Sequence, residues 1–427
     1  MEIFFNLPVL LKIFTSLLII LLGNRYLKNM AFSVALATVV LAFWSGQSLD
    51  TAWEIASVRI FSPAEVVLYV VVYLVIALSS QMKATGTMTT LVHSIGSRLS
   101  NRSSMAVLPA VIGLLPMPGG ALFSAPLVNT CEGADGLTGV TKTQINYWFR
   151  HMWEYWWPLY PGVLLAIALS GLPILEYILL MSPLTVFYLL GGYFFLLRRI
   201  PKGAREKGSV PVKGLFKSIL PILITMTVFG ILEVFLPALG RFSKYVPIGI
   251  GLLLAMVVLQ IQSPLEVKQW KKIFLSSQSV SLVLLIVMIR TYGAFIEAPI
   301  LGGQILMDVM RSELAAWGIP VFLFVALIPF FSGIVMGVAV GTVGASFPIV
   351  LSLLGSNPDP GVLMSTVMMA FAFGHAGQLL SPVHVCLVVS NQYFKVGLLP
   401  SLRGLFLPVA TMLGGAYLIS RIVLLLF

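Results

Sequence analysis

Two short motifs place a histidine three residues before a side chain that can exchange or share a proton. The first is HMWEYWWP at 151–158 and the second is HAGQLLSP at 375–382, so both read His-x-x-Glu/Gln-x-x-x-Pro. Residues three apart share a helix face, which puts His151 beside Glu154 and His375 beside Gln378. A histidine with a carboxylate can relay protons near neutral pH. The motifs fit either such a relay or a plain interhelical hydrogen bond, and the Trp-rich first motif also fits an aromatic belt at a membrane interface.

Two segments rich in glycine and proline interrupt apolar stretches at matching places, PMPGGALFSAP at 116–126 and MGVAVGTVGASFP at 336–348. Backbone that is unwound inside a membrane is costly unless it lines a cavity, where half-helix N-termini can hold an anion and free carbonyls a cation. Proline removes an N–H donor and glycine permits a tight turn. The predicted substrate and ion site therefore consists of the prolines, glycines and hydroxyls of both segments: Pro116, Pro118, Gly119, Gly120, Ser124, Gly337, Gly341, Thr342, Gly344 and Ser346.

Two further stretches, 81–102 and 291–313, are too polar to cross a membrane as single helices. Each is predicted to form a re-entrant hairpin, the alternative being an amphipathic helix at the interface. The first tip would contain Thr85 and Gly86, and the second would span 293–299 with Glu297 as a possible cation ligand. Arg150, just before the first histidine motif, is predicted to lie at the membrane interface, the alternative being a partner for an anion, and Arg290 is also predicted to lie at the interface.

These motifs lie in a chain whose composition indicates a membrane protein. Of its 427 residues, 59% are hydrophobic and only 10% are charged, whereas soluble domains are about 25% charged. This excludes a soluble enzyme, a nucleic-acid binder and a disordered chain. The net charge of +11 is then typical of Lys and Arg in cytoplasmic loops. Cys131 and Cys386 match no metal or disulfide pattern, and no catalytic motif is present, so neither an enzyme, a metal nor a cofactor is predicted.

The two halves of the chain read as one repeat with inverted topology. The paired motifs recur at separations of 222 and 224 residues, which indicates an internal repeat. The first repeat covers 1–197, with the hairpin 81–102 and a broken helix at 104–128. A basic linker at 198–214 leads to the second, 215–427, with the hairpin 291–313 and a broken helix at 315–354. Counting spans from the basic loops puts the two hairpins on opposite sides. The fold class is an all-α polytopic membrane protein of ~10–12 transmembrane helices, and one of two apolar stretches in 129–197 is expected not to span.

This arrangement resembles the ion transporter superfamily, which includes divalent anion/sodium symporters, gluconate permeases and arsenite permeases. PMPGGALFSAP followed by YWFRHMWEYWWPLYPG is most similar to the domain of unknown function 401 family. The resemblance covers the whole chain and implies a secondary carrier, a homodimer, and an elevator-like transport domain that moves against a scaffold. By position it implies substrate loops at 116–120 and 337–344. The Ser-Asn-Thr pattern of the symporters is absent from both loops.

The predicted function is ion-coupled secondary transport of a small anion, a carboxylate or inorganic oxyanion, across the inner membrane of the cell. The coupling ion is either sodium, bound by backbone carbonyls, or a proton, carried by His151 and Glu154. A channel and a membrane subunit of a larger complex are the alternatives. The lipid bilayer and the anion are the expected partners.

Overall fold

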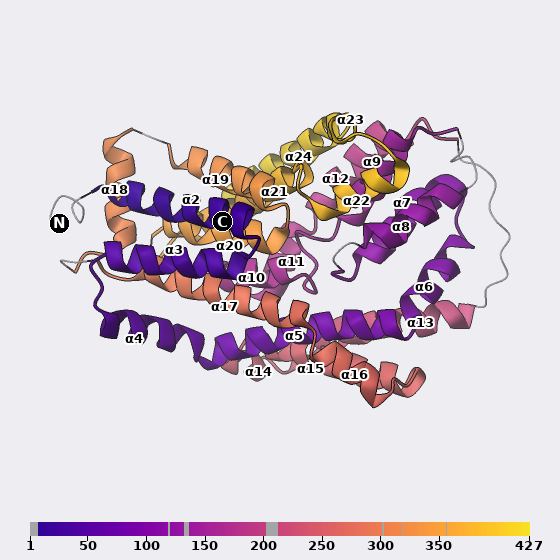
Figure 1. The fold of residues 1–427 in the computed structure, drawn as a ribbon, viewed down its shortest axis with the longest axis horizontal. Coiled ribbons are helices and arrows are strands. Elements are labelled where there is room, and N and C mark those ends of the chain that lie inside the picture. Colours follow the sequence, from indigo (N-terminus) through magenta and orange to yellow (C-terminus); the bar gives the residue numbers. More distant parts are fainter. Residues whose placement is uncertain are drawn as a thin grey trace.

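The computed structural model describes residues 7–117, 120–131, 136–201, 212–300, 303–318, 320–355 and 357–427. Within these ranges every regular element is a helix, apart from an isolated bridge between Pro299 and Ile305. Most helices lie roughly along one direction (Figure 1). Among the described residues, seven helical stretches are long and apolar enough to cross a membrane: Val9–Leu27, Pro63–Ala84, Ile174–Leu197, Gly214–Phe235, Val267–Glu297, Pro360–Leu379 and Leu398–Leu426. The predicted all-α membrane fold is confirmed.

The first half of the chain forms a series of helices interrupted at prolines and glycines. In order they are α2 (Val9–Leu27), α3 (Met30–Trp44), α4 (Leu49–Ile60), α5 (Pro63–Ala84), α6 (Thr87–Gly96), α7 (Asn101–Gly113), α8 (Ala121–Thr130), α9 (Gly139–Arg150), α10 (Pro161–Ser170), α11 (Ile174–Met181), α12 (Leu184–Gly192) and the π-helix η1 (Tyr193–Leu197).

The second half forms a similar series. In order its helices are α13 (Val212–Phe235), α14 (Ala238–Phe242), α15 (Val246–Gln262), α16 (Val267–Phe274), α17 (Ser277–Glu297), α18 (Leu306–Ala316), α19 (Val321–Met336), α20 (Ala339–Ser352), α21 (Pro360–Leu379), α22 (Val385–Phe394), α23 (Leu398–Arg403) and α24 (Phe406–Leu426).

Contacts among the helices of the second half repeat those of the first. α2 packs along α3, and α13 packs along α15. α3 packs against α17 of the other half, and α15 packs against α5. A second pair of contacts between the halves follows the same pattern: α8 packs against α22, and α20 packs against α10.

The central pair of this arrangement, α5 and α17, is antiparallel. Glu65 in the first turn of α5 bonds Arg290 near the end of α17. Farther along α5, the Tyr73 hydroxyl donates to the carbonyl of Phe274, which lies just before α17. These two helices therefore run in opposite directions.

Two pairs of consecutive helices fold back on themselves, and two others do not. α7 and α8 contact each other along their lengths, as do α19 and α20, although only a few residues separate the members of each pair. We call these pairs the first and second hairpins. Within the described residues, α9 with α10 and α21 with α22 make no such extended contact, so each is a helix broken without folding back.

The fold-backs thus lie at 101–130 and 321–352, where the sequence predicts broken helices. At the predicted hairpin 291–313, residues 291–297 instead form the last turns of α17, and a turn at 298–305 leads to α18. At the predicted hairpin 81–102, the chain bends at Thr85 and Gly86 into α6, which packs against α13. The polar residues that suggested the second hairpin are accommodated in a continuous helix because Arg290 and Glu297 have partners, Glu65 and Arg59.

The sequence predicts that one of the two apolar stretches in 129–197 does not span. The second stretch contains Ile174–Leu197, which is long and apolar enough to cross a membrane. The first contains α9 and α10, which are 12 and 10 residues long, and neither qualifies by itself as a span. By length and composition, the described residues agree with this prediction.

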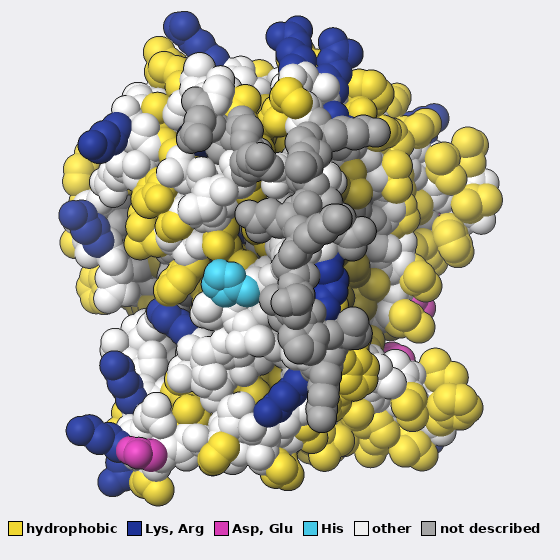
Figure 2. Space-filling view, turned by 90° about the vertical axis from the view of Figure 1, so that its right-hand side faces the viewer, with side chains coloured by type: hydrophobic (Ala, Val, Ile, Leu, Met, Phe, Trp, Pro, Cys, Tyr) yellow, Lys and Arg dark blue, Asp and Glu magenta, His cyan; other side chains and the backbone are white. Residues whose placement is uncertain are grey.

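The two ends of the helix array differ in charge. Most charged side chains in view on the face shown in Figure 2, which is the right-hand end of Figure 1, are Lys and Arg. Exposed cations at the helix ends there include Lys83, Arg198, Arg199, Lys271 and Lys272. The opposite end carries α18 and the end of α17, with the acidic residues Glu297 and Asp308.

Candidate functional site

The two histidine motifs lie at the breaks of the two broken helices. α9 ends at Arg150 and α10 begins at Pro161, while α21 ends at Leu379 and α22 begins at Val385. Proline in the intervening residues of each break supplies no N–H and disfavours helix in the residue before it. α9 ends immediately before His151 and α21 ends four residues after His375, so both motifs lie at the ends of these helices, and the proline that closes each motif lies within the break.

The two breaks meet through corresponding residues of the two motifs. Gln378 Nε2 donates to Glu154 Oε2 at 2.6 Å, and both side chains are buried, at 2% and 7% exposure. This buried hydrogen bond joins the break that follows α9 to the end of α21.

His151 joins this contact to a wider polar cluster. Its Nδ1 lies 2.6 Å from the Tyr147 carbonyl, which assigns the ring proton to Nδ1 and leaves Nε2 as an acceptor. His151 Nε2 lies 3.7 Å from Glu154 Oε1. The ring of His384 packs edge-on against it, with 4.6 Å between the ring centroids. His375, one turn before Gln378, is also buried and packs against the ring of Tyr155.

Arg150 lies inside the protein, although the sequence suggests an interface position. The residue is 2% exposed, its Nη2 donates to the Met117 carbonyl at 2.8 Å, and its Nη1 donates to Cys386 Sγ at 3.3 Å. Nη1 also lies 3.5 Å from His151 Nε2. Among the described residues, no carboxylate oxygen lies within 4.0 Å of its guanidinium nitrogens.

Arg290 is likewise buried, at 8% exposure, in place of the predicted interface position. It lies two turns before the end of α17, and Nε is 2.8 and 2.9 Å from the two carboxylate oxygens of Glu65. Glu65 is not identifiable from the sequence because it follows a proline in an ordinary first helical turn. Only the packing of α5 against α17 brings it to the arginine.

Each hairpin tip rests against the break in its own half. A Cβ on Gly120, at the first tip, would lie 2.9 Å from Arg150 Nε. At the second tip Gly337 has φ +62° and caps α19, and a Cβ there would lie 3.0 Å from the His384 nitrogen. The glycines predicted to permit close approach do so against protein backbone and side chains.

Side chains from the breaks bond carbonyl groups on the first helix of each hairpin. Trp153 Nε1 donates to the Ala110 carbonyl at 2.7 Å, and the Tyr160 hydroxyl donates to Gly113. On the other side, Ser381 Oγ donates to the Ile334 carbonyl at 2.6 Å. These bonds explain the aromatic content of the first break, since Trp and Tyr provide both burial and a donor.

The remaining residues of the two glycine-rich segments have local roles in this structure. The hydroxyls of Ser124, Thr342 and Ser346 donate to carbonyl groups of the preceding helical turn. A Cβ at Gly341 would approach Met30, and one at Gly344 would overlap Ile289 of α17. Pro116 lies just before the first tip, and Pro118 and Gly119 fall outside the described residues.

Three predicted binding residues lie elsewhere. Thr85 bonds the Gln81 carbonyl and the Thr87 hydroxyl at the α5–α6 bend, where Gly86 has φ +69°. Glu297 is exposed at the acidic end and pairs with Arg59 at 2.6 Å. It therefore has an arginine partner at the outer end of α17.

The cluster also contains three groups of the kind that bind transition metals. Nitrogens of His151 and His384 and the sulfur of Cys386 all lie within 4.8 Å of one another, and the three residues are buried. The guanidinium of Arg150 lies against two of these three atoms. A positive charge so close opposes a metal cation, so the cluster is better suited to an anion.

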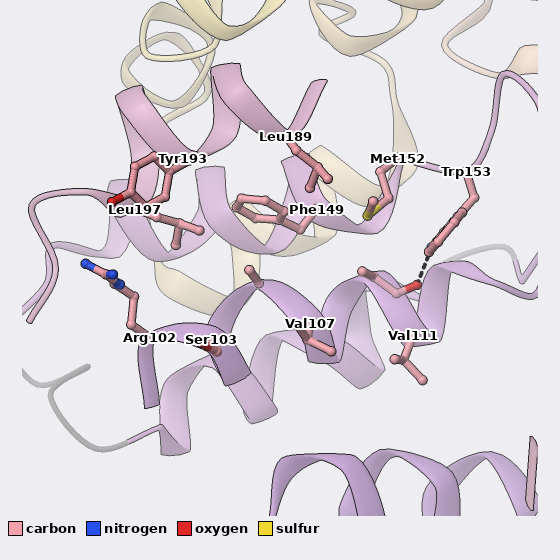
Figure 3. Close-up of a pocket in the computed structure, with 12 residues that line it drawn as sticks. Arg102, Ser103, Val107, Val111, Phe149, Met152, Trp153, Leu189, Tyr193 and Leu197 are labelled. Carbon is pink, nitrogen blue, oxygen red and sulfur yellow. Dashed lines mark hydrogen bonds between the residues drawn. The ribbon is translucent and has the colours of Figure 1, made fainter. Parts of the chain in front are cut away.

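A cavity of about 470 Å³ lies beside the first hairpin, between α7, α9 and η1. Figure 3 shows Phe149 of α9 and Met152, just after α9, facing Val107 of α7 across it, with Arg102 at one end. Its lining is almost entirely apolar, which does not suit a charged solute. The cavity separates the hairpin from α12 and η1.

The chain belongs to the family described as Protein of unknown function (DUF401), whose sequence profile matches residues 6–424. No curated protein matches the sequence. The resemblance to this family that the sequence indicates is therefore confirmed over nearly the whole chain.

Proposed function

We propose that this protein is a secondary active transporter of a small anion, built as an inverted repeat that works by alternating access. The observation that carries the proposal is the meeting of two broken helices at Glu154 and Gln378, each break faced by the tip of a hairpin. Irregular backbone at membrane depth is tolerated where it lines a solute path or is buried in protein. Paired breaks in corresponding halves are typical of transporter binding sites.

The inverted repeat is supported by contacts on both sides of its axis. α5 and α17 are antiparallel, and the helix contacts of one half recur in the other. With α9–α10 and α21–α22 each counted as one broken span, the chain makes about ten crossings. The two hairpins then enter from opposite ends.

An elevator-like movement follows from how the helices group. α2, α3, α5, α13, α15 and α17 contact one another and form a candidate scaffold. The hairpins and broken helices form a second group around the polar cluster. The apolar cavity beside α7 supplies space into which the first hairpin can shift, and such a shift would break the bonds that Trp153 and Tyr160 make to α7. The resemblance to ion-coupled carriers further supports a homodimer in the inner membrane.

Either sodium or a proton serves as the coupling ion. A proton would use Glu154, which is buried beside His151 and Gln378. Sodium would use the carbonyls of the breaks and hairpin tips. We assign no catalytic role to these residues.

Uptake into proteoliposomes tests the proposal. Purified protein is reconstituted, and uptake of labelled carboxylates and oxyanions is measured with a sodium gradient, a proton gradient or neither. We expect accumulation of at least one anion above its equilibrium level under one gradient. Absence of uptake for every anion under both gradients, in protein that remains folded, contradicts the proposal.

A further inference from the structure

We propose that Arg150 binds the transported anion through the edge of its guanidinium group formed by Nε and Nη2. The site lies between the tip of the first hairpin and the N-terminus of α22. This inference rests on the proposed function and deepens it, because it names the recognising residue and the class of substrate. That class is a solute with a carboxylate or oxyanion group that presents two oxygens to one fork.

Among the described residues, no carboxylate contacts the buried charge of Arg150, although Glu154 acts on it at longer range. Removing an ion from water costs several kcal/mol unless a partner compensates it. Arg290 has such a partner, because Glu65 bonds it through both carboxylate oxygens. Arg150 is as deeply buried, yet its partners are a carbonyl, a thiol and a neutral imidazole.

The nearest carboxylate linked to Arg150 by contacts is occupied elsewhere. Glu154 is reached only through His151, whose Nε2 lies 3.5 Å from Arg150 and 3.7 Å from Glu154. Glu154 itself accepts a 2.6 Å bond from Gln378. Among the described residues, the guanidinium therefore has no negatively charged group in contact with it.

The hydrogen-bond pattern shows which edge of the guanidinium lacks an acceptor among the described residues. Guanidinium carries five N–H donors, and only Nη1 and Nη2 have acceptors among the described residues, while the buried Nε has none. Nε and Nη2 form a fork that fits two oxygens of one carboxylate or oxyanion.

Gly120 packs directly against this edge. A Cβ at this position would overlap Nη2 and lie 2.9 Å from both Nε and Cζ. Any other residue at position 120 would therefore press on the guanidinium. Because the tip of the first hairpin buries Nε in this structure, an anion reaches the edge when the tip moves, as alternating access requires.

Two helix N-termini add favourable electrostatics at the same place. α8 begins at Ala121, directly after Gly120, and α22 begins at Val385, with the Arg150 contact Cys386 in its first turn. Each N-terminus carries roughly half a positive charge and favours an anion.

The two halves differ at this position, so the residues that the structure describes form one site of this kind. Arg150 immediately precedes the first motif, and Gly374 immediately precedes the second. Gly374 packs against Thr342 of the second hairpin with no side chain of its own. The repeat thus supplies two similar breaks, and only the first offers a guanidinium.

Ligand-induced stabilisation of the purified full-length protein in detergent tests this assignment. The probes are sodium acetate, succinate, phosphate and sulfate, with sodium chloride at matched ionic strength as the reference. The variants are Arg150→Gln and Arg150→Lys, and the matched control is Arg102→Gln, which removes a cation from the neighbouring α7. A ligand that binds only the folded state raises the unfolding temperature in a saturable way.

We expect at least one probe to stabilise the wild type and Arg102→Gln alike. Its affinity should fall about 30-fold or more in Arg150→Gln, because a buried charge pair loses one partner. Arg150→Lys should also bind more weakly, since an ammonium lacks the fork. Unchanged affinity in folded Arg150→Gln overturns the assignment and leaves the transport proposal intact, whereas a wild type that binds none of the probes overturns both.

If Arg150→Gln does not fold, Cys386 reports on the same site with the arginine intact. In a Cys131→Ser background, methyl methanethiosulfonate can label only Cys386. We expect a saturating concentration of the stabilising anion to slow this labelling at least tenfold. A labelling rate unaffected by the anion overturns the assignment.

Discussion

Replacing Glu65 with glutamine is expected to lower the free energy of unfolding by about 3–5 kcal/mol, because it leaves a buried guanidinium without its counter-ion. Arg290 bonds both oxygens of Glu65, at 2.8 and 2.9 Å from Nε. Both side chains are less than a tenth exposed, which removes most of the solvent screening that weakens surface pairs. The pair also joins α5 to α17, the antiparallel helices at the centre of the two halves.

The matched control is Glu297→Gln. Glu297 also bonds an arginine, Arg59 at 2.6 Å, but its side chain is 59% exposed. An exposed pair contributes about 0–1 kcal/mol, so this variant should unfold almost as the wild type does. Unfolding is measured by titration with sodium dodecyl sulfate in mixed micelles, followed by circular dichroism.

A double-mutant cycle completes the test. Glu65→Gln combined with Arg290→Gln should cost clearly less than the sum of the two single changes, because neither charge remains uncompensated. Strict additivity, or a loss in Glu65→Gln no larger than in Glu297→Gln, would refute the reasoning that burial makes this pair critical.

Three further outcomes are expected. Gly377→Ala should destabilise the protein by about 1–3 kcal/mol, because a Cβ at this position would overlap the backbone at Phe330 of α19. The control is Gly414→Ala, where a Cβ would enter open space. In the same titration this variant should be neutral or stabilising. Glu154→Gln should remove the dependence of uptake on pH between 6 and 8, and a preserved dependence would exclude the relay. Burial, with Arg290 nearby, lowers the pKa of Lys244 from 10.5 to about 8. The unfolded chain therefore binds more protons between these values, and stability should rise with pH across that window more in the wild type than in Lys244→Gln; equal slopes would contradict this.

The predictions made from composition and from short motifs were correct for the helical class of the fold and for the glycines that allow close packing. Apolar composition required membrane-spanning helices, because backbone groups in lipid must be satisfied within the helix. The motif containing His151 and Glu154 and the one containing His375 and Gln378 indeed occupy corresponding places, at the ends of α9 and α21. The glycines at 120 and 337 do permit close approach at both hairpin tips.

The sequence predicts broken helices at 104–128 and 315–354, where the structure has hairpins. Glycine and proline interrupt a helix in both cases, so the residues alone do not distinguish them. Only contacts between the two flanking helices decide whether the chain folds back on itself. The carbonyl groups freed at Ala110 and Ile334 receive bonds from Trp153 and Ser381. These donors lie about 45 residues away along the chain, beyond the reach of any helical period.

The arginines give the sharpest contrast between the two sources of information. Sequence by itself determined a basic, all-helical membrane protein, predicted that its two halves are repeats and named the segments where glycine and proline interrupt the helices. It did not distinguish Arg150 and Arg290 from interface residues, because a flanking charge looks the same whether its helix ends in water or in protein. Tertiary packing decided that Arg290 meets Glu65 while Arg150 meets a hairpin tip without a carboxylate. Burial and the choice of counter-ion depend on helices distant in the chain, and electrostatic free energy depends on exactly those two quantities.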